Sequence, residues 1–198
     1  MKFSALAAAI CFILCGVSGC GGIRTAEEAS QTVVPYAPVN EENVSADECR
    51  IELGDSINVN GQGAWYEDND IVISKGGIYS ISGSYDKGSI VVTAEDPVKL
   101  NFIGAEITNT DDYAIISSSS RLVLASDGES SITGTGGDYK NAVFSSGQLL
   151  IAGTGTMRFY GGVFSVGGIE FGRNINTVCD IITSENGQMI PGTLTVWG

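Results

Sequence analysis

From Ile51 onward, the chain is a series of short apolar runs separated by turn-forming residues. Runs such as "DIVISKGGIYSISG" and "LLIAGTGTMRFYGG" combine β-branched and aromatic residues with Gly, Ser, Asp or Asn between them. This arrangement is typical of β-strands joined by tight turns, and no long stretch carries the period of an amphipathic helix. The pattern therefore predicts one all-β domain over residues 49–198.

Short strand–turn–strand phrases recur along this domain. "AVFSSGQLLIAG" from Ala142 aligns with "GVFSVGGIEFGR" from Gly162, and a looser copy, "AIISSSSRLVLAS", begins at Ala114. A unit of about 26 residues that holds three short strands is typical of a solenoid, in which strands repeat while loops vary in length. We therefore expect a right-handed parallel β-helix of about five coils, with a β-sandwich as the competing fold. The second set of recurring positions is Ile81-Ser82-Gly83, Ile107-Thr108-Asn109, Ile132-Thr133-Gly134 and Phe159-Tyr160-Gly161.

The first 48 residues differ from the rest in composition and in the pattern of apolar residues. Residues 1–19 combine Lys2 with an apolar run that is short for a membrane span, as in an export signal. The run ends in "VSGC", which resembles the lipobox of bacterial lipoproteins, so we expect acylation of Cys20; an ordinary cleaved signal or a core helix is the alternative. Residues 20–48 are rich in Ala, Glu, Asn and Pro and predict a flexible acidic tether with a span of roughly 30 Å. A displaced edge strand in "TVVPYAPV" is the alternative, which Pro35 and Pro38 disfavour. We expect an exported, membrane-anchored lipoprotein on the cell surface.

Charge and the absence of histidine narrow the function. The chain has 10 basic and 23 acidic residues, a net charge of -13, so its surface repels nucleic acid and anionic lipid and attracts cations. Without histidine, Ser-His-Asp and Cys-His nucleophiles and His-ligated zinc are excluded. Paired carboxylates, or a lyase that uses calcium and a basic residue, stay open. No basic residue recurs at one coil position beside an acidic cluster, so we expect no enzymatic activity; the candidates are Arg121, Lys140, Arg158 and Arg173.

Two ordered sets of phrases carry a family resemblance. "DIVISKGGIYSISGSYDKGSIVVTAEDPVKLNFIGAEITN" contains a GGxYxISG phrase, a D-x-G-x-I-x-V turn and a G-A-x-I-T coil, and "KNAVFSSGQLLIAGTGTMRFYGG" contains the next signature. From about Leu53 to Phe171 the chain resembles the bacterial carbohydrate-binding β-helix family. The resemblance implies an exported parallel β-helix that binds cellulose and acidic plant polysaccharide (polygalacturonate), with calcium in its loops. Members of that family carry several more coils, so we expect a truncated member or a smaller binding surface.

Candidate binding residues lie beside the turns. Aromatic rings stack on the apolar faces of sugars, although ordinary packing is an equal alternative. Acidic loops before equivalent strands offer the oxygens that calcium takes, with turn chemistry as the rival explanation. Such a calcium ion would bridge an acidic protein to uronate carboxylates, and "EDND" at residues 67–70 is a weaker second cluster. The sugar candidates are Trp65, Tyr66, Tyr113 and Tyr139, with Tyr85 as a further aromatic; the calcium candidates are Asp111, Asp112, Asp138 and Asn141.

Two of the five cysteines, Cys49 and Cys179, stay in the folded domain. An exported protein with two such residues invites a disulfide. If the two lie at opposite ends of the stack, however, about 20 Å separates them, whereas a disulfide needs Cα atoms within about 7 Å. We therefore expect two thiols.

A surface adhesin or spacer is the alternative to a sugar-binding protein. It would share this fold, anchor and charge, and only affinity for sugar would distinguish the two.

Overall fold

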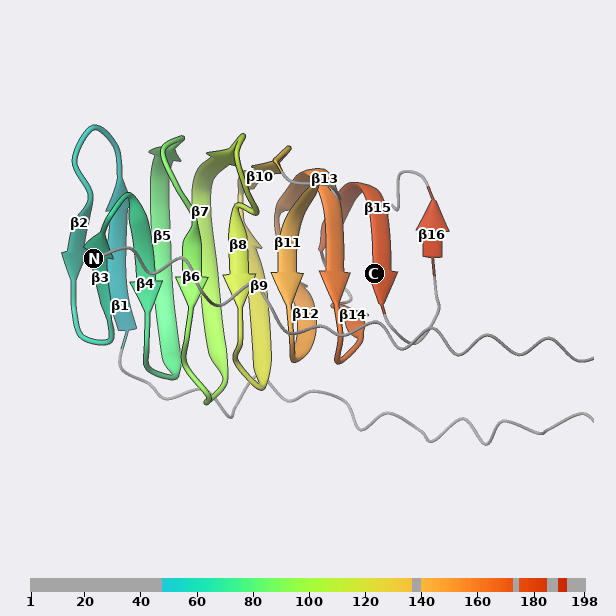
Figure 1. Cartoon of the computed structure of the whole chain (residues 1–198), viewed down its shortest axis with the longest axis horizontal. Helices are drawn as coiled ribbons and strands as arrows, with labels where there is room; N and C mark the ends of the chain where they lie inside the picture. Colours follow the sequence, from blue (N-terminus) through green and yellow to red (C-terminus); the bar gives the residue numbers. More distant parts are fainter. Residues whose placement is uncertain (1–47, 137–139, 173–174, 185–188, 192–198) are drawn as a thin grey trace, which may run out of the picture. The chain divides into compact units, whose positions relative to one another are not determined.

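The computed structural model describes residues 48–136, 140–172, 175–184 and 189–191, all within the second of two units, Asn40–Gly198. These residues form strands and turns, without a helix, in one sheet of sixteen strands (Figure 1). No described segment is a helix long and apolar enough to cross a membrane. The predicted signal, Cys20 and the tether up to residue 47 lie outside the described residues. The strands are β1 (Glu48–Leu53), β2 (Asn58–Asn60), β3 (Ala64–Glu67), β4 (Asp70–Ile73), β5 (Gly77–Tyr85), β6 (Ile90–Val92), β7 (Val98–Asn109), β8 (Ile115–Ser117), β9 (Arg121–Asp127), β10 (Glu129–Gly134), β11 (Asn141–Ser145), β12 (Gln148–Gly153), β13 (Thr156–Ser165), β14 (Ile169–Phe171), β15 (Asn176–Ser184) and β16 (Met189–Pro191).

Three ladders of parallel strands give the fold its order. Ladder A contains β4, β6, β8 and β11, followed by the second halves of β13 and β15. Ladder B contains β1, β5, β7, β9, β12 and β14. Ladder C contains the ends of β5 and β7, then β10 and the first halves of β13 and β15.

Each passage of the chain through the three ladders adds one coil to the stack (Figure 1). The result is an all-β, solenoid-like stack of about four turns, as the repeats predict, and its parallel pairing is unlike that of a β-sandwich. The right-handed sense and the count of five coils stay predictions.

The register confirms the phrase that recurs at Ala142 and Gly162. Phe144 pairs with Phe164, and Leu149 pairs with Ile169 one ladder further on. One predicted repeat is wrong: Ile81 lies in ladder B, whereas Tyr85 is the residue that pairs with Ile107. The error arises because the same Ile-x-Gly pattern occurs inside β5, at Ile81, and at the end of β10, at Ile132, which are two different places on the coil.

The stack ends in antiparallel strands. At the N-terminal end β2 pairs with β1 and β3 pairs with β4, while β16 pairs with β15 at the other end. Such hairpins occupy backbone groups that an open parallel edge would expose. Cys49 in β1 and Cys179 in β15 are both buried, with β5, β7, β10 and β13 between their strands in the pairing order. Their thiol state stays a prediction.

Candidate functional site

A line of apolar side chains runs along the outside of ladder A. Successive side chains of a strand point to opposite faces of the sheet. Ile115 and Ser117 are buried, so Ile116 between them points outward, and the same holds for the central residue of each neighbouring strand. These central residues are register partners, and each is partly exposed. Together with Trp65, which pairs with Val72, we call them the apolar row: Trp65, Val72, Val91, Ile116, Phe144 and Phe164.

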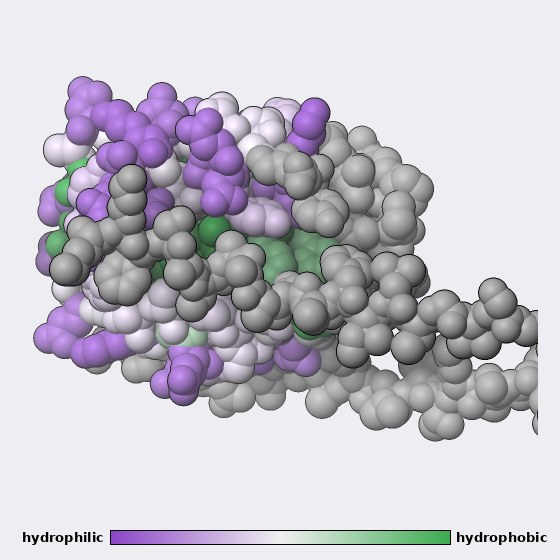
Figure 2. Space-filling view, viewed as in Figure 1, coloured by the Kyte–Doolittle hydropathy of each residue, from purple (hydrophilic) through white to green (hydrophobic). Residues whose placement is uncertain are grey.

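The C-terminal part of the apolar row is aromatic. The rings of Phe144 and Phe164 stack with centroids 5.6 Å apart and planes 14° apart. Tyr113, just before β8, adds a third ring 5.7 Å from that of Phe144. Figure 2 shows hydrophobic surface in the middle of this face, with hydrophilic side chains above and below it. The three rings therefore form an apolar platform across adjacent coils.

The repeated Val-Phe-Ser-x-Gly phrase explains how this platform is held. The valine points into the core and the phenylalanine points outward. The serine is buried at the corner, where Ser165 Oγ donates to Gly147 O at 2.7 Å. A Cβ atom at Gly147 would lie 2.2 Å from Ser119 O, so only glycine fits this close approach of two coils.

The structure divides the predicted sugar-binding residues. Trp65 is 42% exposed and belongs to the apolar row, and Tyr113 packs against it. Tyr66 is 43% exposed but points to the opposite face of β3, where its ring meets Tyr85 edge to face at 6.3 Å. Tyr85 itself is buried and donates to Asn69 O at 2.7 Å; burial and the Tyr66 hydroxyl raise its pKa. Tyr139 lies outside the described residues.

Sequence reasoning missed five members of the apolar row, which are Val72, Val91, Ile116, Phe144 and Phe164. Apolar residues that repeat along a solenoid are expected to form ladders inside its coils, and these five positions depart from that expectation. The reason is the period of two along each strand, which turns the central residue of a three-residue rung outward. The alternation in "VFS", with Phe between two inward-pointing residues, could therefore have predicted that the phenylalanine points outward.

The predicted calcium residues lie in two loops that touch. Asn109 Oδ1 accepts the backbone N–H groups of Asp111 and Asp112 at 2.9 and 3.0 Å, and Asp112 Oδ1 accepts that of Tyr113 at 2.8 Å. A Cβ atom at Gly136, in the next coil, would lie 2.0 Å from the Asp111 carbonyl carbon, so the two loops are in contact.

The other predicted calcium ligands do not complete a site there. Asn141 begins β11, and Asp138 lies outside the described residues. The described part of the chain holds no group of three or more acidic or cysteine side chains that could bind a metal. The visible hydrogen bonds are those of an Asx turn, and the described residues alone do not make a calcium site. In the weaker cluster, Asp70 accepts the Ser89 N–H at 2.8 Å.

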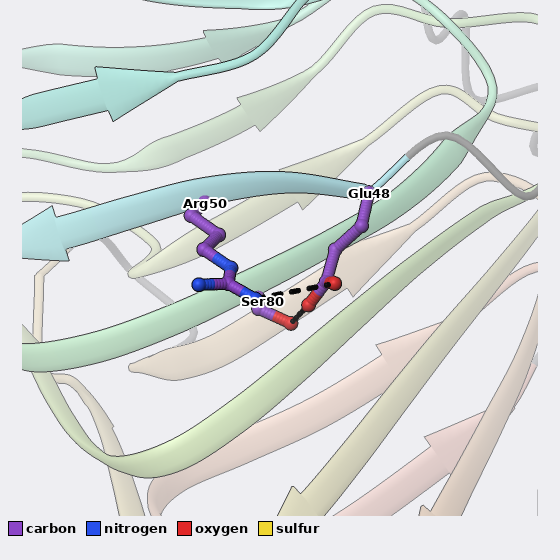
Figure 3. A network of polar contacts seen from close by, with 3 residues as sticks. All are labelled: Glu48, Arg50 and Ser80. Carbon is purple, nitrogen blue, oxygen red and sulfur yellow. Dashed lines mark hydrogen bonds and ion pairs between the residues drawn. The ribbon is translucent and has the colours of Figure 1, made fainter.

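The basic residues considered for catalysis are dispersed. Arg121 begins β9 in ladder B, Lys140 precedes β11 in ladder A, and Arg158 lies in the ladder C part of β13. Arg173 lies outside the described residues. A polar cluster does occur on the outside of ladder B, where Ser80 Oγ donates to Glu48 at 2.5 Å and Arg50 lies 3.9 Å from the same carboxylate (Figure 3). It borders a hollow of about 360 Å³.

Comparison with known proteins identifies the family. The model of a family described as carbohydrate-binding domain-containing protein matches residues 67–171, more than half of the chain. The match runs from the end of β3 to the end of β14 and so includes the apolar row from Val72 to Phe164. Neither the curated proteins nor the solved structures yield a match. The chain therefore belongs to the carbohydrate-binding domain-containing family.

Proposed function

We propose that the protein is a non-catalytic polysaccharide-binding protein whose ligand lies along the apolar row. The stacked rings of Phe144 and Phe164 carry this proposal, because the apolar faces of sugar rings pack on aromatic rings. Parallel strands repeat about every 4.8 Å, so a polymer that follows the stack meets one side chain after another. From Trp65 to Phe164 the row crosses five strand spacings, about 24 Å, which is long enough for several sugar units.

The distribution of charged groups supports a binding role over catalysis. The basic candidates do not converge: Arg121 lies in ladder B, Arg158 lies in ladder C, and Lys140 precedes the ladder A strand β11. Glycoside hydrolysis needs two carboxyl groups on either side of one bond, and general acid–base chemistry needs them at fixed separation. The apolar row consists of uncharged side chains only. We expect incubation with polygalacturonate to release neither unsaturated uronate nor new reducing ends; either product would support a lyase or hydrolase.

We further propose that acidic plant polysaccharide (polygalacturonate) or cellulose is the ligand and that calcium assists the acidic one. Asp111 and Asp112 are exposed and immediately precede Tyr113, so their carboxylates border the aromatic end of the apolar row. A protein of net charge -13 repels a polyuronate unless a cation lies between them. Because the described oxygens are too few for calcium, this proposal depends on Asp138 as well.

The proposed location is the outer surface of the cell, with the protein anchored through lipid on Cys20. The support is the order of Lys2, an apolar run and "VSGC" in the sequence. Attachment through several acyl chains is far firmer than attachment through one. We expect Cys20→Ala to move the protein from the membrane fraction to the soluble fraction, and retention in the membrane would contradict the anchor.

A pull-down on insoluble cellulose and on pectin gel tests the binding face. The Phe144→Ala/Phe164→Ala variant should lose roughly tenfold in affinity, about 1.4 kcal/mol. Tyr160→Ala is the matched control, because Tyr160 is 51% exposed but lies in the ladder C part of β13. If the double variant binds as well as wild type, the glycan does not bind at the apolar row. If neither wild type nor the variants bind any polysaccharide, the result favours the hypothesis that the protein is a surface spacer or adhesin.

A further inference from the structure

A second line of side chains lies beside the apolar row. After β4, β6, β8 and β11 of ladder A, the residue two positions beyond the member of the apolar row carries a hydroxyl group and is exposed. Side chains two positions apart along a strand point to the same face, so these hydroxyl groups lie about 6.6 Å from the apolar row along the strands. We call them the hydroxyl row: Ser74, Thr93, Ser118 and Ser146.

A repeated backbone hydrogen bond keeps the hydroxyl row in register. Each member directly follows the last residue of its strand, and from the second member onward its N–H donates to the preceding coil. These bonds are Thr93 N to Ile73 O at 2.8 Å, Ser118 N to Val92 O at 2.9 Å and Ser146 N to Ser117 O at 2.9 Å. The row therefore rises with the strand spacing, and from Ser74 to Ser146 it extends about 14 Å. Val166 takes the equivalent place in the next coil, with its N–H 2.9 Å from Ser145 O, so the hydroxyl row ends at Ser146.

The two central hydroxyl groups are left as hydrogen-bond acceptors. Thr93 Oγ1 donates to Ile73 O at 3.3 Å, and Ser118 Oγ donates to Val92 O at 3.1 Å, so both bond to the preceding coil in the same way. A serine or threonine hydroxyl has one proton and two acceptor lone pairs. Because each proton is used within the stack, the oxygens of these two exposed residues offer lone pairs to a ligand. The middle of the hydroxyl row is therefore suited to a ligand that donates hydrogen bonds.

We propose that the hydroxyl row is the second half of the binding face and accepts hydrogen bonds from hydroxyl groups along one edge of a neutral, extended glycan chain. This inference rests on the proposed function, in which the sugar rings lie on the apolar row. A pyranose ring carries C–H groups on its faces and hydroxyl groups around its edge. A ring that stacks on Phe144 or Phe164 therefore directs its hydroxyl groups sideways, and the hydroxyl row lies on one of those sides.

The two borders of the apolar row differ in chemistry. Asp111 and Asp112 precede β8, whereas the hydroxyl row follows the strands. An ionised carboxylate has no proton to donate, so a uronate carboxylate beside Thr93 and Ser118 would meet only lone pairs. At the other border it would meet two aspartates and need a cation between them. The hydroxyl groups of a neutral glycan can donate at either border, so the hydroxyl row favours a neutral glycan over a polyuronate.

Removal of the two central hydroxyl groups tests this inference. Thr93→Val/Ser118→Ala nearly keeps the shape of both side chains, and calorimetry with cellohexaose should show roughly tenfold weaker binding because two hydrogen bonds to the ligand are lost. Thr133→Val is the matched control and should bind as wild type does, because Thr133 lies in the ladder C strand β10. Wild-type affinity in the double variant would overturn the inference.

A ligand without donors separates recognition from any structural effect of the substitutions. In O-methylated cellohexaose, methyl groups replace the hydroxyl protons. Wild type should bind cellohexaose at least about tenfold more tightly than the methyl ether, and Thr93→Val/Ser118→Ala should reduce this ratio to about threefold or less. An unchanged ratio would show that the hydroxyl row does not accept hydrogen bonds from the ligand.

The same measurements distinguish this inference from the proposed function. If Phe144→Ala/Phe164→Ala weakens binding of cellohexaose and Thr93→Val/Ser118→Ala does not, the hydroxyl row lies outside the binding face while the apolar row still binds the glycan. If wild type binds no glycan, both proposals fail. If Thr93→Val/Ser118→Ala weakens the binding of polygalacturonate in calcium as much as that of cellohexaose, the preference for a neutral glycan is wrong.

Discussion

Two outward faces of the same solenoid carry apolar side chains, and they differ in kind. The apolar row on ladder A is partly exposed, includes Trp65 and the stacked rings of Phe144 and Phe164, and crosses the stack. On ladder B, the outward residues of β9 and β12 are aliphatic and almost inaccessible to solvent. We call them the covered patch: Val123, Ala125, Leu150 and Ala152. An accessible line of rings suits an external polymer, whereas the four aliphatic side chains are closed to solvent and cannot contact a ligand from outside.

The largest expected difference between the two faces is the cost of a buried charge. Leu150→Asp should lower the free energy of unfolding by roughly 3–5 kcal/mol, because a carboxylate in the covered patch loses its water without gaining a partner. Phe144→Asp, on the accessible row, should cost less than about 1 kcal/mol. Urea unfolding of the two variants measures both values. A Leu150→Asp cost as small as that of Phe144→Asp would mean that the patch is open to solvent.

Neighbouring residues of β11 should separate stability from binding. Val143→Ala opens a cavity in the core and should cost about 2 kcal/mol of stability while leaving glycan affinity unchanged. Phe144→Ala should do the reverse, with a loss of affinity and little loss of stability. Urea unfolding and a cellulose pull-down on the same preparations measure both. If both variants lose stability equally, Phe144 is a core residue and the apolar row is not a ligand surface.

The repeated phrase explains how far the sequence could predict this architecture. The match of Val143-Phe144-Ser145 to Val163-Phe164-Ser165 predicted the register of ladder A, because equal spacing between strand and turn keeps the same residue in each rung. It failed for Ile81 because local motifs do not say which corner of the coil they occupy, and Tyr85 takes that place instead.

The sequence does contain a pattern that predicts the burial of the covered patch. "RLVLAS" and "QLLIAG" are continuous apolar runs without alternation. Continuous apolar strands in parallel sheets are typically buried on both faces, so these runs indicated a covering layer over β9 and β12. The burial of Val123 and Leu150 in the structure agrees with this pattern, and composition alone does not give it.

Alkaline pH should lower the free energy of unfolding but leave glycan binding at the apolar row unchanged. Tyr79 is buried beneath ladder B and donates to Lys75 O at 2.7 Å; burial, followed by nearby Cys49, raises its pKa to about 12. Between pH 9 and 11 the unfolded tyrosine ionises while the folded one stays protonated, so stability should fall by about 1.4 kcal/mol.

Thermal unfolding across this pH range, with Tyr79→Phe as the control, measures that effect. The variant should show a shallower decline, and the remainder should come from Tyr85 and Cys49, because burial raises the pKa of each. The six residues of the apolar row carry no ionisable side chain, so in a Tyr113→Phe background cellulose binding by the folded protein should be the same at pH 9 and 11. A pH-independent stability would contradict the assignment of Tyr79, and pH-dependent cellulose binding would place the ligand elsewhere.

The smallest expected effect concerns the acidic turn at the border of the apolar row. Asp112→Asn keeps a side-chain oxygen that can accept the Tyr113 N–H, so the turn and the ring platform should be preserved while one charge is lost. In calcium, we expect about a threefold loss of polygalacturonate affinity, near 0.7 kcal/mol, with cellulose binding unchanged. Calorimetry with calcium on wild type, Asp112→Asn and Asp112→Ala/Asp138→Ala shows whether an ion binds there. If chelator and all variants leave polygalacturonate binding as it was, the acidic turn serves only to shape the loop, and the apolar row alone accounts for the ligand. If instead Asp112→Asn weakens binding of cellulose and polygalacturonate equally, the turn acts by positioning Tyr113 against Phe144, and charge has no part in it.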